Sequence, residues 1–271
     1  MLSQNIIQQM ACALDEAEQN GQQIEAFTQT HPMMTLEDAY RVQKAWIDMK
    51  LARGRKKIGK KIGLTSRAMQ LAMKIDEPDF GILLDNMLFE NECELVASDF
   101  LDPRVEVEFG FKLKKTLIGN ELSLENVLEA TDYIQPMLEI IAARSYRVHP
   151  QTGYTRTIYD TISDNAASAA FIVGGEKIDP AQLANEIDLA WAGSVLYRNG
   201  EVEETGLGAG ILGHPAKGLI WLAKRLAPFD EGLQAGDFIL AGSFTRPVNC
   251  RAGDRFLADY GRLGKIAFTV I

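Results

Sequence analysis

The segment RVEVEFGFKLKK, residues 104–115, constrains the fold most because apolar and polar residues alternate along it. Successive side chains of a β-strand point to opposite faces, so this period of two predicts a strand with one face in the core. The apolar face would carry Val105, Val107, Phe109, Phe111 and Leu113. Glu106 and Glu108 then lie side by side on the other face. Like charges at this spacing repel each other unless water screens them or a cation binds between them.

The rest of the chain predicts an α+β protein. The segment TLEDAYRVQKAWIDMKLARG (35–54) has helical spacing of apolar residues, with Thr35 as N-cap and Asp38 three residues later. We therefore expect a mostly helical N-terminal region (1–75) and a larger β-rich body (76–271). Short β-like runs in this body lie at 104–114, 168–173, 237–244, 255–260 and 265–271, with helices expected from Ser123, around Pro180 and after Pro215.

Composition excludes several classes of protein. The 271 residues are 46% hydrophobic, which suits a globular core, and the net charge of −9 argues against nucleic acid or an anionic membrane as partner. The three cysteines are far apart, as in proteins of a reducing compartment. The N-terminus resembles an amphipathic helix rather than a signal peptide, and no apolar run reaches the roughly 18 residues of a membrane span. We expect a soluble, cytoplasmic protein.

Glu139 adds a third carboxylate, in the apolar run MLEII. Burying it is costly unless it pairs with a cation, and either a nearby arginine (Arg144 or Arg147) or a metal ion would serve. For Glu106 and Glu108 a solvated strand face is the alternative to a metal site. Three carboxylates without a histidine or cysteine cluster would select a hard cation, Mg²⁺ or Mn²⁺. Mg²⁺ prefers about six oxygen ligands, so positions would remain for water or a chelating substrate.

A set of motifs in fixed order resembles the fumarylacetoacetate hydrolase superfamily, from about residue 35 to the C-terminus. Within it, the chain is most similar to the branch of hydratases and decarboxylases that act on 2-oxo acids. The motifs are KIGLTSRAMQ (61–70), EPDFG (77–81), RVEVE (104–108), LEIIAAR (138–144), DTISDNAA (160–167), LGHPAKGLIWLA (212–223) and GSFTRPV (242–248).

The resemblance implies a mixed β-sheet roll with a smaller helical N-terminal region. It also implies a divalent metal ion, Mg²⁺ or Mn²⁺, held by Glu106, Glu108 and Glu139. On this interpretation the paired glutamates of the first strand exist because a cation lies between them.

The resemblance also implies catalytic residues. Lys61 matches the family lysine that precedes IGLTS and would move protons, although the adjacent Lys60 remains an alternative. Asp79, in EPDFG, matches an acid that would activate water. Without the resemblance, Lys61 would be one member of a solvated basic run, and Asp79 an ordinary turn residue.

Four further residues are expected to bind substrate. Ser163 and Asn165 match pocket residues of the family, whereas Asp164 between them is expected to be structural. Arg67 and Arg246 are candidates for a carboxylate of the substrate, because the guanidinium group pairs with carboxylates through two hydrogen bonds.

The activity implied is metal-dependent hydration of 2-oxo-hept-4-ene-1,7-dioate in aromatic catabolism. The double bond would first move into conjugation with the C2 ketone, and water would then add at C4. The alternatives are a 2-hydroxypentadienoate hydratase, a decarboxylase of the 4-oxalocrotonate type and, in another class, a non-catalytic accessory subunit. A homo-oligomer is expected, with a complex with a pathway decarboxylase as the further alternative.

Overall fold

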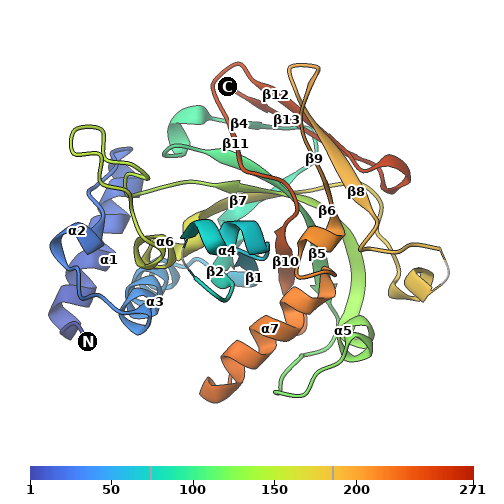
Figure 1. Cartoon of the computed structure of the whole chain (residues 1–271), viewed down its shortest axis with the longest axis horizontal. Helices are drawn as coiled ribbons and strands as arrows, with labels where there is room; N and C mark the ends of the chain where they lie inside the picture. Colours follow the sequence, from blue (N-terminus) through green and yellow to red (C-terminus); the bar gives the residue numbers. More distant parts are fainter. Residues whose placement is uncertain (74, 185) are drawn as a thin grey trace.

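A computed structural model of the chain describes residues 1–73, 75–184 and 186–271. Two mixed β-sheets form its centre, and the first three helices form a separate group beside them (Figure 1). This confirms the predicted α+β class. The helices are α1 (Gln4–Asn20), α2 (Phe27–Thr30), α3 (Leu36–Ala52), α4 (Arg67–Met73), α5 (Leu124–Ala130), α6 (Ile158–Ser163) and α7 (Ala216–Leu226).

The larger sheet has eight strands and carries the predicted strand at its centre as β5. Most neighbours are antiparallel, but β1 pairs with β10, and β3 with β7, in parallel. The strands in spatial order are β2 (Asp79–Leu84), β1 (Lys57–Gly63), β10 (Phe238–Ser243), β5 (Arg104–Leu113), β6 (Thr131–Ile141), β7 (Ser168–Val173) and β3 (Leu88–Glu90), with β11 (Val248–Asn249) also on β5.

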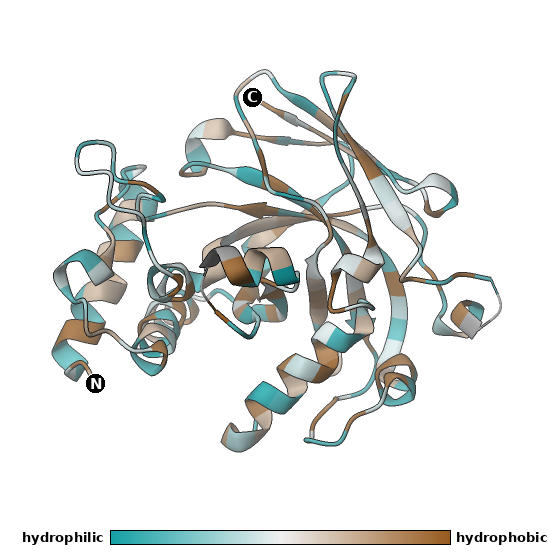
Figure 2. Ribbon diagram, viewed as in Figure 1, coloured by the Kyte–Doolittle hydropathy of each residue, from teal (hydrophilic) through white to brown (hydrophobic). Residues whose placement is uncertain are grey.

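The smaller, five-stranded sheet contains the predicted C-terminal hairpin as β12 and β13. Apolar side chains from both sheets, α5 and α7 form one core cluster. In Figure 2, brown and teal residues alternate around α7, as expected for a helix with one buried face. The strands in spatial order are β4 (Cys93–Leu95), β13 (Lys265–Val270), β12 (Arg255–Asp259), β8 (Gly193–Arg198) and β9 (Glu201–Leu207).

The N-terminal helices pack on their own cluster, which includes Leu14, Val42 and the buried Trp46. Thr35 and Asp38 form the predicted capping box of α3. The domain boundary near residue 75 stays a prediction, although strand β1, which precedes it, already belongs to the larger sheet. Among the described residues, no helix is long and apolar enough to cross a membrane.

Two of the expected helices are shorter in the structure. The helix expected from Ser123 ends at Ala130, where strand β6 begins, because the following apolar residues extend into the sheet. The segment after Pro180 forms only a short 3-10 turn. The 3-10 turns are η1 (Asp85–Met87), η2 (Ala97–Asp99), η3 (Asn165–Ala167), η4 (Pro180–Ala184), η5 (Gly208–Gly210), η6 (Ala227–Phe229) and η7 (Gly261–Leu263).

Candidate metal centre and active site

Strands β5 and β6 bring the three predicted carboxylates together. Glu106 lies directly opposite Glu139 in the antiparallel register, and Glu108 is two residues further along the same face of β5. One carboxylate oxygen from each of the three residues lies within 4.8 Å of the others. This geometry requires no loop, because two neighbouring central strands of the sheet position all the side chains.

The surroundings leave these carboxylates short of partners. Glu108 and Glu139 are buried, and Glu106 is partly exposed. The backbone N–H of Gly242 donates to Glu108 Oε2 at 2.9 Å, but neither oxygen of Glu139 accepts a hydrogen bond from any described residue. A solvated strand face is therefore excluded. Buried carboxylate oxygens without donors are the ligands that a hard divalent cation requires, so the residues present fit Mg²⁺ or Mn²⁺.

The electrostatics of the cluster also favour a cation. Burial of its carboxyl group, together with repulsion from Glu139, raises the pKa of Glu106 to about 7, although Lys61 opposes the shift. Burial and repulsion from Glu139 and Glu106 raise the pKa of Glu108 well above its usual range. Protons therefore compete with a metal ion for these oxygens.

Lys61 supplies the positive charge closest to Glu139. Its Nζ lies 3.2 Å from Glu139 Oε2, although the two groups are not aligned for a hydrogen bond. Burial acts to lower the pKa of Lys61, but the nearby carboxylates of Glu139 and Asp79 outweigh it and raise the pKa well above its usual range. The arginines proposed from sequence as partners of Glu139 lie elsewhere: Arg144 pairs with Asp164, and Arg147 with Asp102.

The structure also separates the two adjacent lysines. Alternation along β1 turns Lys60 to the opposite face of the sheet from Lys61. There its Nζ lies 3.9 Å from a carboxylate oxygen of Asp237. Of the two lysines, Lys61 is thus the one that faces the carboxylates.

Asp79 is the first residue of β2 and lies opposite Gly63 of β1. Its carboxyl group is buried, and Oδ1 has no hydrogen-bond partner among the described residues. Burial raises the pKa of Asp79 to about 6, against the influence of Lys61. An acid that titrates near neutral pH suits general acid–base chemistry.

Gly63 makes the position of Asp79 possible, and sequence reasoning missed it. A Cβ at Gly63 would lie 2.2 Å from Asp79 Oδ1 and 3.4 Å from Lys61 Nζ. Only glycine leaves room for the two side chains to meet. The signal was present in the motif KIGLTS, where this glycine follows Lys61 by two residues.

Tyr260 is a second residue that the sequence did not reveal. Its buried hydroxyl lies 3.0 Å from the backbone oxygen of Glu108 and 2.8 Å from that of Met137. The single hydroxyl proton can be shared between these two carbonyls, which belong to β5 and β6. Tyr260 thereby fixes the backbone next to the glutamates of the carboxylate cluster.

Ser163 and Asn165 make their observed contacts with the backbone. Ser163 Oγ donates to the carbonyl oxygen of Tyr159 at 2.8 Å. Asn165 bonds both backbone groups of Ile82 in β2: its Nδ2 donates to the carbonyl oxygen at 2.9 Å, and its Oδ1 accepts from N–H at 2.8 Å. These contacts support the strand that carries Asp79, and direct binding of substrate stays a prediction for both residues.

The turn that carries Asn165 is held in an unusual conformation. Asn165, Ala166 and Ala167 have φ values of 53°, 51° and 62°, in the left-handed region that disfavours non-glycine residues. The preceding Asp164 is buried and pairs with Arg144 and Arg156. These buried ion pairs support the structural role expected for Asp164.

Arg67 and Arg246 lie outside the carboxylate cluster. Arg67 is exposed at the first position of α4. The side chain of Arg246 is 81% exposed and pairs with Glu204 at 2.6 Å. Its neighbour Thr245, however, accepts a hydrogen bond from the backbone of Val107 between the two glutamates. The backbone thus places Arg246 near the site, although its side chain does not point to the cluster.

Comparison with known proteins places the chain among hydratases and decarboxylases. It is 50% identical over 258 residues to a 2-oxo-hept-4-ene-1,7-dioate hydratase from Escherichia coli, with 95% of each chain covered. It is 37% identical over 258 residues to a 2-hydroxyhexa-2,4-dienoate hydratase from Comamonas testosteroni, with 94% of each covered. No family model matches the chain.

Solved structures agree with this placement. A 4-oxalocrotonate decarboxylase from Pseudomonas putida G7, complexed with magnesium and adipate, has a TM-score of 0.93 at 33% identity, with coverage of 100% of this chain and 99% of that one. A fumarylpyruvate hydrolase from Pseudomonas aeruginosa, in complex with Mn²⁺ and pyruvate, has a TM-score of 0.59 at 16% identity, covering 79% and 89% of the two chains. The second likeness concerns the fold alone.

Fold and site together define a metal-dependent enzyme with the fumarylacetoacetate hydrolase fold, whose cofactor is a divalent cation. The chain belongs to the hydratase and decarboxylase branch of the fumarylacetoacetate hydrolase superfamily. Within it the chain is a hydro-lyase, as the named function of its similar relatives indicates.

Proposed function

We propose that the enzyme hydrates 2-oxo-hept-4-ene-1,7-dioate to a 4-hydroxy-2-oxo diacid in the breakdown of aromatic compounds. The observation that carries the proposal is the convergence of Lys61 and Asp79 on the cluster of Glu106, Glu108 and Glu139. The 50% identity to a hydratase of this substrate supports a substrate with a seven-carbon chain.

The metal proposed is Mg²⁺ or Mn²⁺, held by the three glutamates. When bound, it supplies a Lewis acid for the C1 carboxylate and C2 oxygen of a 2-oxo acid. The buried faces of β5 and β6 exclude water around these groups and so strengthen the electrostatic interactions there.

Lys61 is proposed to move the proton that brings the double bond into conjugation. Its amine would take a proton from C3 and return one at C5, which converts the 4-ene to the 3-ene. The carboxylates that surround Lys61 raise its pKa in the absence of a cation. Neutralising their charge would lower that pKa and free the amine to accept a proton.

Asp79 is proposed to activate water for addition at C4. As a base it would take one proton from the water while the hydroxyl bonds to C4, and a proton would then return to C3. Its buried position opposite Gly63 keeps the carboxylate next to Lys61, so both groups would address the same face of the substrate.

The remaining substrate contacts are proposed from Arg246, Arg67, Ser163 and Asn165. Arg246 is the candidate for the second carboxylate of the diacid, which would replace Glu204 as its partner. For Ser163 and Asn165 the proposal requires a second contact in addition to the backbone bonds that they already make.

A decarboxylase is the second candidate, favoured by the likeness to the 4-oxalocrotonate decarboxylase structure. Metal chelation and proton movement by Lys61 would serve that reaction as well. A 2-hydroxypentadienoate hydratase would use the same groups on a shorter substrate. A non-catalytic accessory subunit would have no need for the complete set of glutamates, lysine and aspartate.

Product analysis by proton NMR tests these candidates. Protein with Mg²⁺ receives 2-oxohept-4-ene-1,7-dioate, 2-hydroxypenta-2,4-dienoate or 2-oxohex-3-ene-1,6-dioate in separate samples. We expect a 4-hydroxy-2-oxo diacid from the first, loss of this product in Glu106→Gln, and its retention in the control Glu94→Gln, an exposed residue of β4. Release of carbon dioxide from the third without hydration of the first would identify a decarboxylase, and no turnover of any would favour the accessory role.

We further propose a cytoplasmic homo-oligomer that works alone or with a pathway decarboxylase. The three cysteines are free in the structure, as suits a reducing compartment. Sedimentation of the purified protein, with and without the decarboxylase, tests both assemblies.

A further inference from the structure

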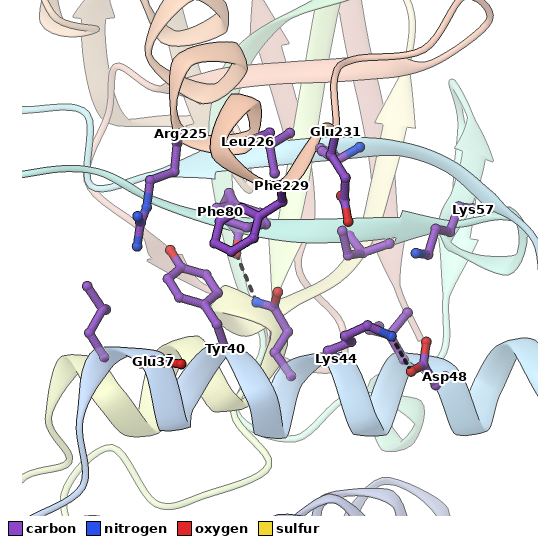
Figure 3. A pocket seen from close by; sticks show the side chains of 15 residues that line it. Glu37, Tyr40, Lys44, Asp48, Lys57, Phe80, Arg225, Leu226, Phe229 and Glu231 are labelled. Carbon is purple, nitrogen blue, oxygen red and sulfur yellow. Dashed lines mark hydrogen bonds and ion pairs between the residues drawn. The ribbon is translucent and has the colours of Figure 1, made fainter. Parts of the chain in front are cut away.

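A cavity of about 480 Å³ lies on the reverse side of the strands that carry Lys61 and Asp79. Helix α3 forms one wall, strands β1 and β2 the second, and the end of α7 with η6 the third (Figure 3). Since side chains alternate along strands, Lys60 and Phe80 face this cavity, whereas their neighbours Lys61 and Asp79 face the carboxylates. The cavity is therefore separate from the metal centre.

The walls of this cavity are largely apolar and aromatic. The rings of Tyr40 and Phe80 stack with their centroids 4.7 Å apart, and Phe229, at the side of α7, also lines the cavity (Figure 3). Phe229 is 68% exposed, which is unusual for so large an apolar side chain. Leu36, Ile47, Ile82 and Leu226 complete the apolar lining. The volume and the lining are those of a site for a small organic molecule.

Lys60 is the most deeply buried charged residue that lines the cavity. The residue is only 9% exposed, and its Nζ forms no hydrogen bond with any part of the chain that the structure describes. The carboxylate of Asp237 lies 3.9 Å away, too far for a hydrogen bond. Burial lowers the pKa of Lys60, because an ammonium group in apolar surroundings is costly unless an anion binds to it.

None of the other charged residues that line the cavity forms a hydrogen bond with Lys60. Lys44 pairs with Asp48 at 2.6 Å within α3. The guanidinium of Arg225 lies 5.6 Å from the ring centroid of Tyr40. The lining charges that remain are Lys57, Lys60 and Arg225 against Glu37 and Glu231. These charges cancel once Asp237 beside Lys60 is counted, so the preference for an anionic ligand rests on the buried ammonium group of Lys60.

We propose that this cavity binds a small carboxylate with an apolar or aromatic body. The carboxylate would pair with the Nζ of Lys60, and the apolar body would lie against Phe229 and the stacked rings of Tyr40 and Phe80. The occupant is a free small molecule rather than a side chain of a second copy, because Lys60, which would hold the carboxylate, is only 9% exposed. The proposal is independent of the substrate assigned above.

Isothermal titration calorimetry of the metal-free protein tests the proposal with 4-phenylbutyrate and its uncharged amide as probes. We expect the acid to bind at least tenfold more tightly than the amide, a difference of about 1.4 kcal/mol. Lys60→Met should abolish this preference, whereas Lys61→Met, on the other side of the strand, should retain it. Ile82→Phe, which fills the cavity, should weaken both probes at least tenfold.

Equal affinity of the acid and the amide would overturn the proposal, as would a preference that disappears in Lys61→Met but not in Lys60→Met. A cavity closed by a second copy would appear as binding that is lost in the oligomer and restored on dilution, and this also would contradict it. The acid and amide comparison on the unchanged protein remains decisive if Lys60→Met fails to fold. None of these measurements requires turnover, so they stand if the proposed hydration is wrong.

Discussion

Lys61 and Glu139 form a buried ion pair: Nζ of the lysine lies 3.2 Å from Oε2 of the glutamate, and their side chains are 4% and 0% exposed. The lysine is surrounded by further carboxylates, so its loss leaves several buried negative charges uncompensated. The loss of Glu139 leaves the lysine with partners. We therefore expect the loss of Lys61 to destabilise the protein more than the loss of Glu139.

Lys61→Met should destabilise the metal-free protein at pH 8 by about 3–5 kcal/mol, and more than Glu139→Gln does. Both variants should lower turnover by at least about 100-fold. Urea unfolding and initial rates measure the two effects, with the exposed Lys56→Met as control. Equal destabilisation by the two changes would show that the lysine does not neutralise the cluster.

Metal binding should depend strongly on pH. The pKa of Glu106 is about 7 in the folded protein and 4.5 for an ordinary glutamate, so the folded state binds more protons between these values. The free energy of unfolding of the metal-free protein should therefore fall as the pH rises from about 4.5 to about 7. Mg²⁺ replaces the protons and should raise the melting temperature more at pH 8 than at pH 5.5.

Differential scanning fluorimetry with and without Mg²⁺ checks this prediction. Glu106→Gln should flatten the pH dependence, whereas the exposed Glu94→Gln should not. A Mg²⁺ effect of the same size at both pH values would show that the carboxylates are already ionised in the metal-free protein.

Gly63→Ala should impair catalysis while the fold persists. The new Cβ would lie 2.2 Å from Asp79 Oδ1, so the carboxylate must move away from Lys61. We expect kcat to fall at least about tenfold, since a misplacement of about 1 Å costs this much or more. Gly210→Ala is the matched control, because its Cβ would make an ordinary contact at 3.5 Å. An unchanged kcat in Gly63→Ala would show that Asp79 does not take part in the reaction.

Asn165→Ala should distinguish two roles of Asn165, support of strand β2 and direct contact with the substrate. It removes both hydrogen bonds to the Ile82 backbone and should cost about 1–3 kcal/mol of stability. If Asn165 acts through β2, kcat falls and its pH profile shifts with Asp79. A rise in KM alone, at unchanged stability, would instead indicate a direct contact with substrate. The exposed Asn249→Ala serves as control in urea unfolding and steady-state kinetics.

The local patterns of the chain predicted its elements well where they were long and regular. The strand at 104–114 and the helix that Thr35 begins are present as β5 and α3. The helix expected from Ser123 was predicted too long because its apolar tail suits a helix and a strand equally well. Contacts with β5 decide in favour of the strand.

For the site, spacing within one strand predicted that Glu106 and Glu108 share a face, since a strand fixes the direction of alternate side chains. That Glu139 lies opposite Glu106 depends on the register between β5 and β6, which no local pattern contains. The same is true of the choice between Lys60 and Lys61, which depends on how β1 pairs with β2 and β10 and therefore on which face of the sheet each side chain takes.

By itself the sequence determined the chemistry of this protein: carboxylates in an apolar strand, a lysine and an acid in recognisable motifs, and too few histidines and cysteines for a softer metal site. These properties follow from residue type and local geometry. Only the tertiary structure decided that Gly63 makes room for Asp79, that Arg246 pairs with Glu204, and that a cavity lies behind the site. Such relations join residues far apart in the chain, and they arise only when strands pair and side chains pack.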